Sequence, residues 1–275
     1  MIKTRKQFAQ HWLKSEKALD RIVQAAEIDR GDRILEIGPG TAVLTRRLLA
    51  LASSVVAVEI DRNLCQLLVQ KLGRLENFLL LQGDFLSLDL ATLLAPFPIF
   101  QKPNKVVANI PYNITGPILE KLLGTIAEPN PEPYESIVLL VQKEVADRLY
   151  AKPESKAFGA LSVRVQYLAA CEQICIVPAG AFQPPPKVDS AVVRLRPRTL
   201  STLAKDPQQL ETLVKIGFSA KRKMLRNNLK AVVDSDRLSH LLQELKINPQ
   251  ARAEDLSVTQ WVDLSNRLEV REQGE

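Results

Sequence analysis

The chain has few of the residues that bind metals or form disulfides. Its 275 residues include three cysteines and two histidines. Cys65, Cys171 and Cys175 form no Cys-x-x-Cys pair, and His11 and His240 are far apart in the chain. These absences exclude a disulfide framework and give no basis for a structural zinc site, so we expect no bound metal. The sparse cysteines are expected to be reduced thiols, which favours a cytoplasmic protein.

Long hydrophobic runs are also missing. No apolar stretch reaches the roughly 20 residues that a membrane-spanning helix needs, and the opening MIKTRKQFAQHW has no apolar segment of the secretory type. Aromatic residues make up only 5%, but apolar residues in total reach 46%, which allows a buried core. Lys and Arg outnumber Asp and Glu by 37 to 31, a formal net charge of +6. We therefore expect no membrane partner, and the positive charge favours a polyanionic one.

Short apolar runs alternate with longer segments through most of the chain. A helix is expected over residues 16–28 with Ser15 as its N-cap. Segments 41–51 and 62–72 are long enough for crossover helices. This alternation predicts an α/β fold with a mostly parallel, Rossmann-like sheet. The expected strands are residues 33–37, 54–59, 78–81, 106–108, 137–141 and 191–195.

The pattern changes past Pro197. Glycine becomes rare, strand-like runs stop, and leucines recur at helical spacing, as at Leu238, Leu241, Leu242 and Leu245. We therefore expect a catalytic α/β domain at residues 1–197 and a small all-α domain at residues 198–275.

Two basic clusters stand out in the sequence. Between residues 221 and 230, five cations occur without an acid, and on a helix they would cover one broad side suited to an RNA backbone. The alternative is an ordinary solvated helix face. A second cluster lies near the start of the chain. The cations of the first cluster are Lys221, Arg222, Lys223, Arg226 and Lys230, and those of the second are Lys3, Arg5, Lys6, Lys14 and Lys17.

Three candidate ligand-binding positions follow successive predicted strands. Residues 36–41 read Glu-Ile-Gly-Pro-Gly-Thr, and Gly38 lets the backbone approach a ligand closely. Val43 occupies the third glycine position of the dinucleotide fingerprint, so the loop alone is weak evidence. Glu59 could hold ribose hydroxyls, and Asp84 could accept a hydrogen bond from an adenine amine. Each acid could instead be a solvated loop residue, but all three positions fall at the sheet edge where such folds bind ligands.

A fourth strand end carries the motif Asn109-Ile110-Pro111-Tyr112. An aromatic ring can stack on a planar base while carbonyl oxygens accept from its exocyclic amine. The alternative is a turn whose tyrosine packs in the core. The neighbouring candidate ligand-binding positions favour the base-binding interpretation.

Together these residues resemble the class I methyltransferases that use S-adenosylmethionine. In that family, Gly38 and its neighbours would pass the methionine part of the cofactor, Glu59 would hold the ribose and Asp84 the adenine. Asn109-Ile110-Pro111-Tyr112 resembles the N/D-P-P-Y/F motif of methyltransferases that act on adenine amines.

Three further segments resemble the small-subunit ribosomal RNA adenine dimethyltransferases (KsgA type). Residues 5–13 resemble their R-K-x-F-G-Q-N-F-L opening, residues 182–190 their F-x-P-x-P-K-V-D-S signature, and residues 218–229 the basic helix of their C-terminal domain. The resemblance places His11, Leu13 and also Asn109 in the cofactor site, although His11 stands where the family usually has Asn. It also makes Phe182 a candidate for stacking on the second face of the target base, the alternative being a core phenylalanine.

The resemblance implies a reaction and a substrate. Asn109 Oδ1 and the Ile110 carbonyl would accept the two hydrogens of an adenine amine, and Tyr112 would stack on the ring. No strong general base is required. The expected activity is dimethylation of two adjacent adenines near the 3′ end of small-subunit (16S) ribosomal RNA, in pre-30S particles, by a monomer.

Three other functions remain open from the sequence. The related large-subunit adenine methyltransferases of macrolide resistance share the cofactor motifs. A binding or assembly role, as in the related mitochondrial transcription factors, belongs to a different class. A nicotinamide oxidoreductase is disfavoured by Val43 and by the lack of a histidine placed for hydride relay.

Overall fold

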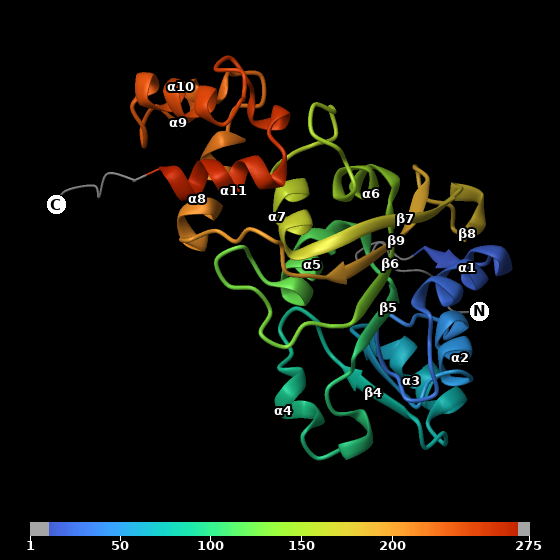
Figure 1. Cartoon of the computed structure of the whole chain (residues 1–275). Coiled ribbons are helices and arrows are strands. Elements are labelled where there is room, and N and C mark those ends of the chain that lie inside the picture. Colours follow the sequence, from blue (N-terminus) through green and yellow to red (C-terminus); the bar gives the residue numbers. More distant parts are fainter. Residues whose placement is uncertain (1–10, 269–275) are drawn as a thin grey trace. The chain divides into compact units, whose positions relative to one another are not determined.

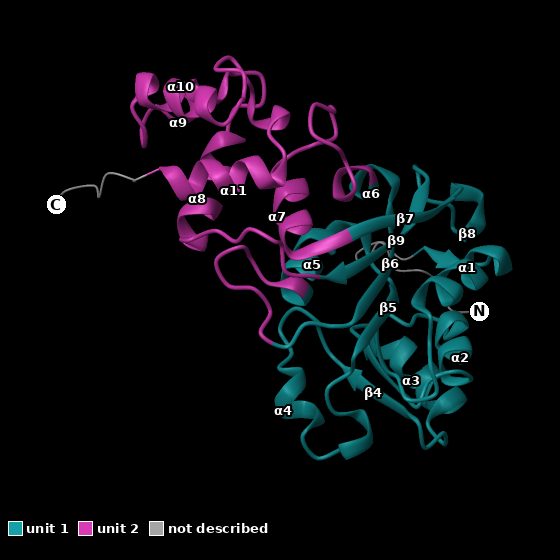
Figure 2. Cartoon of the chain, viewed as in Figure 1, with its two compact units in different colours: residues 1–122, 132–146, 171–197 teal, residues 123–131, 147–170, 198–275 magenta. Residues whose placement is uncertain are grey.

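The computed structural model describes residues 11–268 (Figure 1). These residues form two compact units, drawn in different colours in Figure 2. The first unit takes residues up to 122 together with 132–146 and 171–197. The second takes residues from 198 onward, as well as the earlier segments 123–131 and 147–170, which lie within the range expected for the catalytic domain.

A seven-stranded sheet forms the centre of the first unit, with strand order β4-β3-β2-β5-β6-β9-β7. Strands β2 to β6 pair in parallel, whereas β9 runs antiparallel to β6. The Rossmann-like, parallel-rich fold that the sequence predicts is thereby confirmed. The strands are β2 (Arg33–Ile37), β3 (Ser54–Glu59), β4 (Phe78–Gln82), β5 (Lys105–Asn109), β6 (Ser136–Gln142), β7 (Ala169–Val177) and β9 (Ser190–Pro197).

Helices connect these strands. Helix α1 (Glu16–Ala26) begins at Ser15, whose side chain accepts from the Ala18 N–H at 3.3 Å, as the sequence predicts. The apolar side of α1 packs on β5, β6 and β9, where Leu19 and Ile22 are almost completely buried. The other helices of this part of the chain are α2 (Val43–Leu49), α3 (Arg62–Leu72), α4 (Leu90–Leu94), α5 (Thr115–Leu123) and α6 (Lys143–Leu149).

A small two-stranded sheet joins the N-terminal segment to the segment before β9. Strand β1 (Trp12–Leu13) pairs antiparallel with β8 (Phe182–Gln183), so that Leu13 lies opposite Phe182. Both side chains belong to the same buried apolar cluster as α1. This pairing is the reason why residues far apart in the sequence reach the same region.

The described part of the second unit is mainly helical. Helices α7 (Ala160–Leu168), α8 (Pro207–Gly217) and α11 (Val258–Arg267) pack on one another. Trp261 is completely buried, and its ring lies 5.7 Å from that of Phe218 between centroids. This unit also contains the short helix α9 (Leu225–Leu229) and helix α10 (Ser235–Glu244).

The expected basic helix over residues 221–230 is wrong in its extent. Helix α9 begins only at Leu225 and has five residues. Met224 is extended, with φ −59° and ψ 146°, and bridges Arg252, while the Lys223 N–H closes a turn onto the Ala220 carbonyl. These backbone bonds keep Lys221, Arg222 and Lys223 outside the helix.

Candidate functional site

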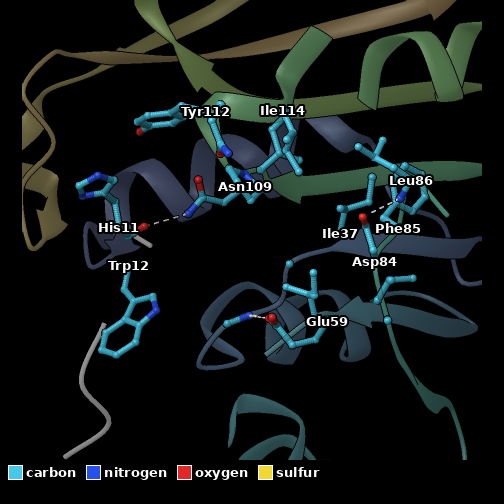
Figure 3. A pocket seen from close by; sticks show the side chains of 18 residues that line it. His11, Trp12, Ile37, Glu59, Asp84, Phe85, Leu86, Asn109, Tyr112 and Ile114 are labelled. Atoms are coloured by element: carbon cyan, nitrogen blue, oxygen red, sulfur yellow. Dashed lines mark hydrogen bonds between the residues drawn. The ribbon is translucent and has the colours of Figure 1, made fainter. Parts of the chain in front are cut away.

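The candidate site lies at the carboxyl edge of the parallel strands. Strands β2 and β5 are neighbours although β3 and β4 separate them in the chain, so the chain reverses its direction across the sheet there. Open α/β sheets bind ligands outside such a switch point. A cavity of about 220 Å³ lies at this edge (Figure 3). Its lining includes His11, Trp12, Gly38, Gly40, Glu59, Asp84, Phe85, Leu86, Asn109, Ile110, Pro111, Tyr112 and Ile114.

Two glycines shape the loop after β2. Gly38 and Gly40 have φ values of +69° and +57°, which residues with a Cβ adopt at a cost. The Gly38 N–H donates to the Val58 carbonyl at 2.9 Å, which fixes the loop against β3. Trp12 lies over Gly40, since a Cβ built there would be 3.6 Å from the indole. The loop therefore exposes backbone, and not side chains, to the cavity.

Glu59 ends β3 beneath this loop and is 5% exposed. Its carboxylate accepts from the N–H groups of Asp61, at 2.9 Å, and Gly40, at 3.3 Å. Burial raises the pKa of Glu59, and these two N–H groups oppose that rise. They also fix the orientation of the carboxylate at the cavity wall.

Glu36 is a second buried acid and lies near Glu59. Burial, with a contribution from the Glu59 charge, raises the pKa of Glu36 to about 8, while the Thr45 side chain acts in the opposite direction. Glu36 is 1% exposed, and its Oε2 finds no hydrogen-bond partner among the described residues. Two acids this close are best accommodated when one of them is neutral.

Asp84 lies in the turn after β4. Its Oδ1 accepts from the Leu86 N–H at 3.0 Å, and its carbonyl accepts from the Leu88 N–H at 3.1 Å. Phe85 is almost completely buried behind it. The carboxylate faces the cavity from the side opposite the Asn109 motif (Figure 3).

The motif of residues 109–112 leads from β5 into α5. The Asn109 Nδ2 donates to the His11 carbonyl at 3.4 Å, which leaves the amide oxygen available as an acceptor. The hydroxyl groups of Tyr112 and Ser190 are hydrogen-bonded at 2.6 Å. Burial raises the pKa of Tyr112, and the bond to Ser190 opposes it. The tyrosine therefore enters the site as a neutral phenol with a fixed ring.

His11 covers one side of that ring. The imidazole and the Tyr112 ring are stacked, with centroids 5.9 Å apart and an interplanar angle of 19°. The His11 Nδ1 lies 2.9 Å from the Pro184 carbonyl. A residue expected at the cofactor thus lies beside the motif expected to bind the base (Figure 3).

The side chains of two expected site residues are buried in the apolar core. Leu13 and Phe182 are 6% and 2% exposed and belong to the apolar core, and neither lines the cavity. The β1–β8 pairing directs both side chains into this core, so Phe182 offers no open face to a base. The cavity is also lined by Ile60 and Ile114, ordinary apolar residues beside the motif positions that no sequence pattern singles out.

The basic residues differ in their availability. Lys221 is engaged by the Glu254 carboxylate at 3.3 Å and by the Lys156 carbonyl. Arg222 and Lys223 are exposed, whereas Arg226 is half-buried. Of the N-terminal cluster, Lys14 and Lys17 are exposed, and the other three expected cations, Lys3, Arg5 and Lys6, lie outside the described residues.

Residues 11–268 contain neither a grouped set of metal ligands nor a membrane-spanning helix. Within this range, no group of three or more His, Cys, Asp or Glu side chains is placed to hold a metal ion. None of the helices in the same range is both long and apolar enough to cross a membrane.

Known proteins resemble the chain over nearly its whole length. The ribosomal RNA adenine dimethylase family matches residues 1–270. A protein of Trichormus variabilis named ribosomal RNA small subunit methyltransferase A is 74% identical, covering 98% of this chain and 100% of its own. The protein of the same name from Synechococcus elongatus is 57% identical over 96% of this chain and 95% of its own.

Two solved structures share the fold. A dimethyladenosine transferase from Plasmodium falciparum has a TM-score of 0.74 at 28% identity, covering 92% of this chain and 96% of its own. The 23S rRNA methyltransferase ErmE has a TM-score of 0.73 at 29% identity, covering 94% and 99%.

Proposed function

Since the chain belongs to the ribosomal RNA adenine dimethylase family, we propose that the cavity at the carboxyl edge of its sheet is the active site. The enzyme uses S-adenosylmethionine to dimethylate adenine amines of small-subunit ribosomal RNA. One observation supports this location above all: Gly38, Glu59, Asp84 and Asn109, each at or just after a different strand end, line the same cavity.

The residues on three sides of the cavity fit the cofactor. Glu59 presents a fixed carboxylate for the ribose hydroxyls, and Asp84 presents one for the adenine amine. The positive-φ glycines keep side chains away from the amino-acid end. When bound there, S-adenosylmethionine supplies an electrophilic methyl group on a sulfonium.

The fourth side fits the target base. The Asn109 Oδ1 and the Ile110 carbonyl would accept the two hydrogens of an adenine amine, which favours a more tetrahedral nitrogen. Pro111 restricts the turn, and the fixed Tyr112 ring supports the face of the base. The base must leave its stack to reach this position. No side chain is required as a strong base, since the nitrogen loses a proton easily once it carries the new methyl group.

The finer substrate also belongs to this proposal. We expect two adjacent adenines near the 3′ end of 16S ribosomal RNA to be modified within pre-30S particles, by a cytoplasmic monomer. The exposed cations Arg222 and Lys223 would contact phosphates, while Arg226 is less available and Lys221 must first leave Glu254. His11 would have to move, or the ring pair would have to open, for a base to reach the covered side of Tyr112.

The decisive experiment replaces Asn109 with alanine. We expect Asn109→Ala to abolish methyl transfer to unmethylated small subunits, because one acceptor for the amine is lost, while labelled S-adenosylmethionine still binds. The control is Asn113→Ala, an exposed neighbour at the cavity rim, which should retain at least about half of the activity if only the motif acceptor matters. Unimpaired turnover by Asn109→Ala would overturn the role of Asn109.

The likeness to the 23S rRNA methyltransferase ErmE supports a second candidate, which is a large-subunit adenine. Primer extension on both ribosomal RNAs, after incubation with each unmethylated subunit, separates the two. A stop confined to the small-subunit RNA supports the first candidate, and a stop in the large-subunit RNA supports the second.

A further inference from the structure

Lys121 joins helix α5 to the turn that carries Asp84. It is half-buried, and its Nζ donates to the carbonyl of Leu88 at 2.7 Å and to that of Leu86 at 3.1 Å. The same ammonium lies 5.1 Å from the centroid of the Phe85 ring, within cation–π range. A single side chain thus contacts three residues of one turn, Phe85, Leu86 and Leu88.

The turn is thereby fixed from two directions. From inside, Asp84 accepts from the Leu86 and Leu88 N–H groups through its side chain and its carbonyl. From outside, Lys121 binds the carbonyls of the same two residues. Burial lowers the pKa of Lys121, whereas the negative charges of Asp84 and Asp89 act in the opposite direction and favour the ammonium.

The helix that carries Lys121 begins at the base-binding motif. The 3-10 turn Tyr112–Ile114 runs directly into α5, and the Thr115 hydroxyl donates to the Tyr112 carbonyl at 3.2 Å. Lys121 therefore connects the Asp84 turn to the same rigid element that positions Tyr112. A shift of that turn would move the cofactor carboxylate relative to the base-binding residues.

We propose that Lys121 is a positioning residue that sets Asp84 for recognition of the 6-amino group of the cofactor's adenine. This inference rests on the proposed role of Asp84. This role differs from a general contribution to folding in one respect. Lys121 affects the recognition of the adenine amine, and affects the binding of the rest of the cofactor much less.

The experiment measures binding of two product analogues by calorimetry. S-adenosylhomocysteine carries the 6-amino group, and S-inosylhomocysteine carries an oxygen there, which the Asp84 carboxylate would repel. Sites built to hydrogen-bond a group reject analogues that lack it, so the wild type should prefer the adenine compound. We expect Lys121→Met to weaken the binding of S-adenosylhomocysteine by about tenfold or more. The binding of S-inosylhomocysteine should weaken by less than about threefold, so that the preference for the adenine compound shrinks.

Two further variants serve as controls. Lys121→Arg keeps a cation and donors and should recover part of the preference. Lys71→Met removes an exposed lysine from the last turn of α3 and should bind both analogues like the wild type. In turnover assays, Lys121→Met should raise KM for S-adenosylmethionine while kcat at saturating cofactor changes little. Equal weakening of both analogues, or no weakening of either, would overturn the proposal.

Asp84→Asn separates this inference from the proposed function. If Asp84→Asn reduces the preference and Lys121→Met adds nothing in that background, the two residues act together as proposed. If Asp84→Asn reduces the preference but Lys121→Met does not, only the role of Lys121 fails. If Asp84→Asn leaves the preference intact, the placement of adenine at Asp84 fails, and this inference fails with it.

Discussion

Asn109 and Tyr112 belong to one short motif, yet each is fixed by a different part of the chain. The Asn109 amide binds the His11 backbone beside β1, whereas the Tyr112 hydroxyl binds Ser190 at the start of β9. Ser190 is completely buried, so its hydroxyl has little freedom to follow a moving ring. The orientation of the tyrosine is therefore a property of the antiparallel β6–β9 pair as well as of the motif.

Substitutions of Tyr112 separate the ring from its hydroxyl. Tyr112→Phe keeps the stacking surface and loses only the bond to Ser190, so we expect methyl transfer in single turnovers to fall by less than about tenfold. Tyr112→Ala also removes the stacking surface, which is worth about 1–3 kcal/mol per base, and should cost about tenfold or more beyond the Phe variant. Equal rates for the two variants would show that the ring does not support the base.

Sequence motifs at strand ends predicted seven residues that line the cavity: Gly38, Glu59, Asp84 and the four residues of the Asn109-Ile110-Pro111-Tyr112 motif. They could be predicted because each lies at or just after the end of an apolar strand, and the ends of parallel strands share an edge of the sheet. The stack of His11 on Tyr112 could not be predicted, since it depends on the pairing of β1 with β8, which are far apart in the sequence. Phe182 shows a different limit. Its motif can be recognised in the sequence, but the sequence does not show that its side chain points into the apolar core.

At the scale of elements, the packing of α8 against α11 depends on a missing side chain. Gly217, the last residue of α8, faces Trp261, and a Cβ built there would lie 2.5 Å from the indole. The glycine thus allows the two helices to approach while the indole stays fully buried. Helical propensity alone would favour alanine at this position.

We expect Gly217→Ala to destabilise the protein by about 1–3 kcal/mol, because overpacking outweighs the propensity gain. Urea unfolding followed by tryptophan fluorescence measures this effect. The matched control is Gly116→Ala in α5, where a new Cβ meets nothing within 4 Å and should be neutral or stabilise by up to about 1 kcal/mol. A Gly217→Ala variant as stable as the wild type would mean that the indole moves aside readily.

The strands of the sheet were predictable because central parallel strands are buried on both faces and form continuous apolar runs. β7 was not, since its sequence AACEQICIV mixes exposed and half-buried positions at the end of the sheet. The expected helix over residues 221–230 failed for another reason. Its composition suits a helix, but backbone bonds of Met224 and Leu225 to residues 251 and 252 compete with the helical ones.

At the scale of the whole molecule, two buried acids give stability opposite dependences on pH. Burial acts to raise the pKa of Asp32, but hydrogen bonds from Lys105, Asp29 and Asn104 outweigh it and hold that pKa below the ordinary 3.8. Its contribution is present above that value and is lost as the pH falls below it. The pKa of Glu36 is raised, so its contribution is present below 4.5 and is lost as the pH rises toward about 8.

Glu36→Gln tests the alkaline side of this balance. A neutral amide of the same shape cannot ionise, so the free energy of unfolding should change less between pH 5 and pH 8.5 than in the wild type. Each unit of pKa shift corresponds to about 1.4 kcal/mol, which makes the difference several kcal/mol at most. Urea unfolding at both pH values measures it, and parallel pH profiles for the two proteins would contradict a protonated Glu36.

The antiparallel pairing of β6 with β9 also matters while the protein is being made. β6 lies inside the finished sheet between β5 and β9, and six of its seven residues are buried. The ribosome completes β6 well before it reaches Ser190, and at about 5–20 residues per second the interval lasts seconds. During that interval the apolar strand SIVLLVQ has one open edge, a ready template for another chain. A nascent chain of this enzyme therefore carries an aggregation hazard in the middle of translation, and β9 removes it when it emerges.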